Sequence, residues 1–141
     1  VYKNAEYGFW FRYPSYWELD DSSGNRIFLS SPEKEFLDLD EPPTDMSFNI
    51  YEKGPVSILE FIQSYSEGWY SHYASRQNIK VGGMDALKFN DKVRAPYEAT
   101  FVNLGSRVLL ITLSGYYPGI SNYKLGIFDK ILSTFKFIEP E

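Results

Sequence analysis

The stretch "YEATFVNLGSRVLLITLSGY", residues Tyr97 to Tyr116, predicts the hairpin on which the rest of the fold is built. Two runs that favour extended structure flank a turn at Leu104 to Ser106, which contains a glycine. The return run, "VLLITL", is apolar at consecutive positions rather than at alternate ones, so both of its faces are expected to be buried. A strand buried on both faces lies in the middle of a sheet. We therefore expect an antiparallel sheet with this strand at its centre.

The segments before and after this hairpin predict one more hairpin and two helices. "NIKVGGMDALKF", Asn78 to Phe89, has a Gly82-Gly83 pair that suits a tight turn between two strands. "SILE", Ser57 to Glu60, has capping-box spacing and predicts a helix that ends near Tyr73. A second helix is predicted from about Asn122 to Phe135. The apolar stripes that should face the core are Ile58, Phe61, Ile62, Tyr65 and Trp69 in the first helix, and Leu125, Phe128, Ile131, Leu132 and Phe135 in the second.

The N-terminal stretch "EYGFWFRYPSYW", Glu6 to Trp17, holds seven aromatic rings in twelve residues. In an extended strand Phe9, Phe11 and Tyr13 fall on one side, and Trp10 and Arg12 on the other. We expect this strand to pack its phenylalanines into the core and to end at Pro14. The alternative is an exposed platform that stacks on sugar rings or unpaired bases, for which the binding candidates are Trp10, Tyr116 and Tyr117.

Two further strands are predicted, in "RIFLSS" (Arg26 to Ser31) and in "MSFNIYEK" (Met46 to Lys53). The element order is then β-β-β-α-β-β-β-β-α, which indicates an α+β fold in which helices cover one antiparallel β-sheet. A chain of 141 residues forms about one domain, so we expect a single domain over residues 1–141. Since the chain begins with Val1 rather than Met, we expect it to have been cut from a longer precursor.

Composition and charge bear on several classes of function. Nine acidic residues against Arg26 and Lys34 give residues 18–45 a balance of −7, so the rest of the chain sums to +2 within a total of −5. No basic surface for a nucleic acid backbone is indicated. The chain has no cysteine, which excludes disulfides and thiolate chemistry. No apolar run reaches the roughly 18 residues that a membrane span needs, and the start does not resemble a signal peptide.

Three segments together resemble the PsbP-like family: "EYGFWFRYPSYW" near the start, "VGGMDALKF" in the middle and "FDKILSTFKFIEP" at the end. The resemblance covers about Tyr2 to Pro140. It implies an α/β/α sandwich in which helices lie on both sides of an antiparallel sheet. It also implies a non-enzymatic, extracytoplasmic protein, since bacterial members are secreted proteins or lipoproteins. The photosynthetic members help retain calcium and chloride near a manganese cluster, but the chain has no motif onto which that role can be transferred.

Little in the sequence indicates catalysis or a cofactor. His72 is the single histidine, and we expect it to lie partly buried near the end of the first helix rather than in a catalytic triad. A nucleophile elbow, a dinucleotide-binding glycine motif and a phosphate-binding loop are all absent from the sequence. We therefore expect no catalytic residues and no cofactor.

Four carboxylates in "DLDEPPTD" are the candidates for a hard cation such as calcium: Asp38, Asp40, Glu41 and Asp45. Calcium takes six to eight oxygen ligands, and the EF-hand order with its central glycine and final glutamate is not present. We expect a solvated acidic loop that binds calcium weakly or not at all.

The function that these observations favour is a non-catalytic binding or accessory domain, located outside the cytoplasm or in the cell envelope. It would contact a protein or an envelope component, not a nucleic acid, and would reach a membrane only if the expected precursor carries an N-terminal anchor. Two alternatives stay open. One is a hydrolase that uses a cleft near His72 and nearby carboxylates, and the other is a structural spacer within a longer surface protein.

Overall fold

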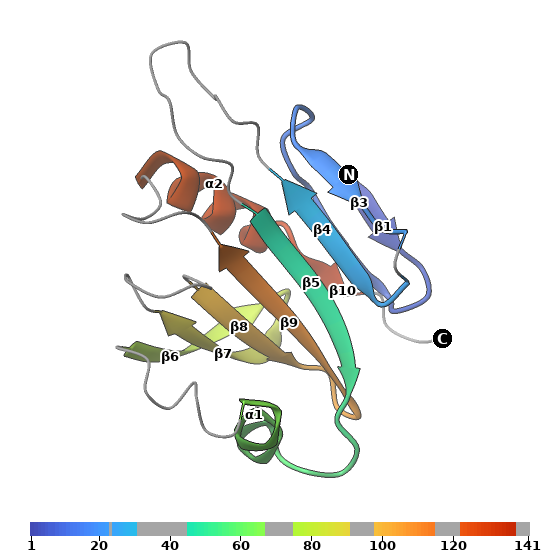
Figure 1. Ribbon diagram of the computed structural model, residues 1–141, viewed down its shortest axis with the longest axis vertical. Coiled ribbons are helices and arrows are strands. Elements are labelled where there is room, and N and C mark those ends of the chain that lie inside the picture. Colours follow the sequence, from blue (N-terminus) through green and yellow to red (C-terminus); the bar gives the residue numbers. More distant parts are fainter. Residues whose placement is uncertain (23, 31–44, 67–74, 91–97, 115–121, 138–141) are drawn as a thin grey trace.

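The computed structural model describes residues 1–22, 24–30, 45–66, 75–90, 98–114 and 122–137. Within these ranges the chain forms ten strands and two helices (Figure 1). In chain order they are β1 (Tyr2–Asn4), β2 (Phe9–Phe11), β3 (Glu18–Asp20), β4 (Arg26–Ser30), β5 (Asp45–Glu52), α1 (Ile58–Ser66), β6 (Ser75–Val81), β7 (Met84–Asn90), β8 (Glu98–Asn103), β9 (Arg107–Ser114), α2 (Asn122–Ser133) and β10 (Lys136–Phe137).

The main sheet has seven strands in the order β3-β4-β5-β9-β8-β7-β6, and every neighbouring pair is antiparallel. The predicted central strand is confirmed, because β9 has three strands on each side of it (Figure 1). Its alternate residues enter two different cores. Leu109 and Ile111 contribute to one, and Val108 and Leu110 to the other. Burial on both faces explains why this strand is apolar at consecutive positions.

Both predicted hairpins are confirmed. Strands β6 and β7 meet at Gly82-Gly83, where φ is +57° and +86°, and Val81 pairs with Met84 across the turn. A two-residue turn with both φ angles positive matches the twist of the flanking strands, and glycine adopts these angles without a Cβ clash. Strands β8 and β9 turn at residues 104–106, where the Leu104 backbone N–H donates to the Arg107 carbonyl at 2.9 Å.

A second, three-stranded sheet lies outside the main sheet, in the order β1-β2-β10. The sequence predicted a single sheet that includes the opening strand, and this is wrong in one respect: β2 pairs with β1 and β10 instead. The prediction that Phe9 and Phe11 are buried is confirmed, because both are fully buried. The Phe11 ring lies 4.7 Å from the ring of Phe48 in β5 and 5.0 Å from that of Phe135. The small sheet therefore packs on one face of the main sheet.

The two helices contribute to different cores. Ile58, Phe61 and Ile62 of α1 pack with residues from strands β7, β8 and β9, and the Ser57 hydroxyl caps the helix by accepting from the Glu60 backbone N–H at 3.1 Å. Helix α2 packs on the other face together with the small sheet. Of its predicted stripe, Phe128, Ile131 and Leu132 are buried, and so is Phe135 just after the helix. The side chains of Tyr65, Trp69 and Leu125 lie outside the described residues, as do residues 67–73 of the first predicted helix.

The predicted element order is incomplete. Five strands rather than three precede α1, and one more strand follows α2. The three additional strands, β1, β3 and β10, contain only two or three residues each, too few to show an alternating pattern. The molecule is mostly antiparallel sheet with two short helices. No helix in the described part of the chain is long and apolar enough to cross a membrane.

Candidate functional site

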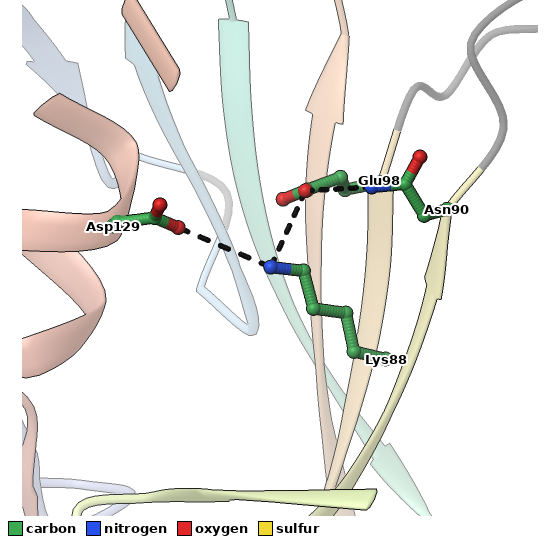
Figure 2. A network of polar contacts seen from close by, with 4 residues as sticks. All are labelled: Lys88, Asn90, Glu98 and Asp129. Carbon is green, nitrogen blue, oxygen red and sulfur yellow. Dashed lines mark hydrogen bonds and ion pairs between the residues drawn. The ribbon is translucent and has the colours of Figure 1, made fainter. Parts of the chain in front are cut away.

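A network of charged side chains lies on the α2 side of the main sheet (Figure 2). Strands β7 and β8 pair Lys88 with Thr100 and Asn90 with Glu98, so these four residues share one face. The Lys88 ammonium lies 3.3 Å from Glu98 Oε1, and Asn90 Nδ2 donates to the same oxygen at 3.0 Å. Asp129 of α2 approaches Lys88 from the other side, at 3.9 Å. The network thus joins two neighbouring strands to the helix above them.

Glu98 is the deeply buried member of this network. Its side chain is 6% exposed, against 16% for Lys88 and 67% for Asp129. Burial raises the pKa of the Glu98 carboxyl, and the positive charge of Lys88 opposes this shift. Glu98 Oε2 and the Thr100 hydroxyl are buried, and neither has a hydrogen-bond partner in the structure as described. A buried charge with one oxygen unpaired is costly, so Lys88 is what makes the ionised carboxylate tolerable.

The chemistry of this network is limited by how its members are placed. Glycoside hydrolysis, for example, uses two carboxylates that flank the reacting bond. Here the second carboxylate, Asp129, is mostly exposed, and within the described part of the chain it touches the network only through Lys88. Glu98 Oε1 is already held by an ammonium and an amide. The arrangement fits a polar link that orients α2 on the sheet.

A groove lies on the opposite face, between α1 and the edge of the main sheet at strands β6 and β7. We call it the α1–β6 groove, and its cavity measures about 420 Å³. Its lining residues are Ile58, Leu59, Ile79, Ala86 and Leu87 and the polar Arg76, Asn78, Asp85 and Asn103. Ile79 and Ala86 belong to the core on the other face, so Ile58, Leu59 and Leu87 supply the apolar side chains of the groove. The side chain of Leu59, at the rim of this groove, is 47% exposed. A mostly apolar hollow with a few polar groups is the form that ligand sites take.

A shallower hollow of about 320 Å³ lies between the chain after β2 and helix α2. Tyr13, Pro14 and Tyr16 line one side of it, and Lys130 and Thr134 the other. The Arg12 backbone N–H donates to the Thr134 hydroxyl at 2.8 Å, which fixes the two walls together. Part of the aromatic N-terminal stretch is thus at the surface, while Phe9 and Phe11 are in the core.

Of the site residues predicted from sequence, only Trp10 has a side chain within the described part of the structure. Trp10 is half-buried on the outer face of the small sheet, where it pairs with Lys3 on one side and Lys136 on the other. Asp45 begins β5, but its side chain is outside the described residues. Also outside them are Asp38, Asp40, Glu41, His72, Tyr116 and Tyr117. Among the described residues, no group of three or more acidic or histidine side chains could hold a metal ion.

Sequence reasoning missed Glu98, Lys88 and the α1–β6 groove. The available signal for the network was a glutamate that opens the otherwise uncharged run "EATFVN", beside a strand predicted to be central. A charge at such a position needs a partner on a neighbouring strand, and Lys88 occupies it. The groove gave no signal in the sequence, because it depends on where α1 lies relative to β6.

No family model and no curated protein matches this sequence. Among solved structures, the chain is similar to a protein from Bacteroides thetaiotaomicron VPI-5482 with a TM-score of 0.59 at 12% sequence identity. The match covers 93% of this chain and 45% of that one, so the present chain corresponds to less than half of its neighbour. At this identity the likeness shows a shared fold.

Proposed function

We propose that this chain is a non-catalytic binding domain that contacts a protein through the α1–β6 groove. The observation that carries the proposal is the groove itself, a cavity of about 420 Å³ whose rim includes the exposed side chain of Leu59. Cavities of roughly 300–1,000 Å³ with apolar walls and a few polar groups accommodate ligand side chains or small molecules. An exposed leucine at such a rim is an anchor for an apolar contact.

The charges at the groove support binding rather than catalysis. Lys80 and Asp85 form an ion pair, and their side chains are 68% and 79% exposed. Exposed ion pairs stay solvated and lack the desolvation that tunes a catalytic acid or base. Arg76 carries a fixed positive charge that can orient a ligand but does not transfer protons near neutral pH.

The PsbP-like relationship belongs to the same proposal. It is supported by the antiparallel sheet with α1 packed on one face and α2 on the other, the arrangement that an α/β/α sandwich requires. In this proposal the domain is presented outside the cytoplasm or in the cell envelope, as bacterial PsbP-like proteins are, and binds a protein or envelope component there.

A random peptide library displayed on phage and panned against the purified domain tests the proposal. We expect enriched peptides that lose binding to the Leu59→Asp variant, which places a charge on the rim, and that keep binding to a Tyr16→Asp control at the other hollow. Enriched peptides that bind Leu59→Asp as well as the parent, or no enrichment at all, would refute the groove as the binding site.

A parallel screen addresses the non-catalytic part. The purified domain is incubated with ester, glycoside and phosphate substrates beside a His72→Ala variant. We expect no turnover by either protein. Turnover by the parent that disappears in His72→Ala would overturn the proposal in favour of a hydrolase.

A further inference from the structure

Strand β6 is the last strand of the main sheet, and its outer edge borders the α1–β6 groove. In a two-residue hairpin the flanking pair, Val81 and Met84 here, exchanges both backbone hydrogen bonds. Bonding alternates along an antiparallel pair, so the next residue along, Lys80, directs its N–H and C=O away from β7. By the same alternation Asn78 and Arg76 do so too. No strand in the described part of the chain pairs with these outward groups.

The side chains of these three residues lie on the groove side of the sheet. Asn78 is paired with Leu87 and Arg76 with Phe89, and both partners belong to the core under α1. Arg76 is exposed and has no ion pair among the described residues, whereas Lys80 is paired with Asp85. An extended chain added to this edge would therefore meet two cations on one face, with Asn78 and the apolar cavity between them.

We propose that β6 binds an extended acidic peptide by strand addition, with two carboxylate side chains four residues apart opposite Arg76 and Lys80. Four residues of strand span roughly 13 Å in both chains, so the two charge pairs are in register. Directly opposed residues in a sheet share a face, so the peptide residue opposite Asn78 points toward the cavity. An apolar side chain at that position would lie beside Asn78, at the β6 side of the cavity. This inference rests on the proposed function of the groove and specifies its ligand.

Charge favours such a peptide over a second copy of this chain. Antiparallel pairing of two β6 strands about Asn78 would place Arg76 of each copy opposite Lys80 of the other, and like charges at opposed positions are destabilising. Lysine and arginine on an edge strand also discourage edge-to-edge association in general. The charges of Arg76, Lys80 and Asp85 at this edge sum to +1, whereas the net charge of the whole chain is −5. The edge therefore suits a negatively charged segment.

Fluorescence anisotropy with labelled synthetic peptides tests the inference. The probe contains Glu-Thr-Val-Thr-Glu, and the control peptide contains Lys-Thr-Val-Thr-Lys. We expect the glutamate peptide to bind, the lysine peptide not to bind, and affinity to fall as salt is added. The Arg76→Glu variant should lower affinity at least about tenfold because like charges then oppose each other. The matched Arg12→Glu control changes the same charge on the far side of the molecule and should bind like the parent.

Backbone pairing needs a separate readout. A glutamate peptide that is N-methylated at the backbone nitrogens facing β6 keeps its side chains but loses its donors, and it should bind much more weakly. Equal binding by the methylated peptide, equal binding by Arg76→Glu, or no binding by the glutamate peptide would overturn strand addition. So would self-association of the parent that blocks binding of the glutamate peptide, because the occupant of the edge would then be a second copy. Library peptides that depend on Leu59 but not on Arg76 would leave the proposed function intact and refute only this inference.

Discussion

Replacing Lys88 by methionine should destabilise the protein far more than the same replacement at Lys80. Both lysines pair with a carboxylate. Lys88 is 16% exposed beside the 6% exposed Glu98, whereas the Lys80–Asp85 pair is 68% and 79% exposed. Methionine retains the apolar stem of lysine, so each variant removes mainly the charge.

The expected magnitudes follow from this difference in burial. Removing one member of a buried ion pair leaves an uncompensated charge and costs about 3–5 kcal/mol. Breaking an exposed pair costs about 0–1 kcal/mol. The buried value is an upper bound here, because Lys88 retains some solvent contact and the Glu98 carboxyl can take up a proton. Protonation is favoured in the variant because Lys88 opposes the rise in the Glu98 pKa that burial causes.

Urea unfolding followed by tryptophan fluorescence measures both variants. The loss of stability in Lys88→Met should be smaller at about pH 5 than at about pH 8, since a protonated Glu98 no longer needs a cation. The double variant Lys88→Met/Glu98→Leu should recover most of the loss, because it removes both charges. If Lys88→Met costs no more than Lys80→Met at either pH, the network in Figure 2 does not hold a buried charge and the reasoning fails.

Three further predictions use the same unfolding measurement. Phe11→Ala should lower the free energy of unfolding by roughly 3–5 kcal/mol, because Phe11 is fully buried among stacked rings. A loss no larger than that of an average surface variant would show that the small sheet is not packed on the core. Gly83→Ala should lower the free energy of unfolding by about 1–2 kcal/mol, because alanine is strained at the positive φ of this position. Gly82→Ala should lower it clearly more, because the added Cβ would also lie 2.7 Å from the Phe137 ring. Equal losses in the two variants would contradict that contact. Burial raises the pKa of Glu98 in the native state, so the native state holds the Glu98 proton more tightly than the unfolded chain does, and parent stability should fall as pH rises through that pKa. Glu98→Gln should flatten this dependence, and a parallel pH profile in parent and variant would refute the assignment.

The parts of the fold that were predicted from sequence share one property: their signals are local. The apolar run in β9, the glycine pair at the β6–β7 turn and the capping serine before α1 each specify their own conformation over a few residues. These signals predicted both hairpins, the central strand and the start of the first helix. Burial of Phe9 and Phe11 followed equally from alternation in a short window.

The short strands and the second sheet could not be predicted in this way. Strands β1, β3 and β10 are too short to carry a pattern, and β10 exists because it pairs with β2, which lies more than 120 residues earlier in the chain. The sequence predicted that the opening strand belongs to the main sheet, because a strand with one buried face has the same alternating hydrophobic pattern in either sheet. It belongs to the small sheet because it pairs with β1 and β10, and the Phe11 ring packs that sheet against Phe48 of β5. The pairing with β10 and the contact with Phe48 both join distant segments of the chain.

By itself, the sequence determined that this protein is an antiparallel β-rich domain with two helices, since hydrophobic periodicity and turn residues act over neighbouring positions. The candidate sites were decided only by tertiary structure. Lys88 and Glu98 form a buried pair because β7 and β8 adopt one particular register, and a shift by one residue would move both charges to the opposite face. The α1–β6 groove exists because helix and edge strand lie side by side without filling the space between them. Register and the fit between packed elements are set by the sum of many distant contacts, and no short stretch of sequence encodes that sum.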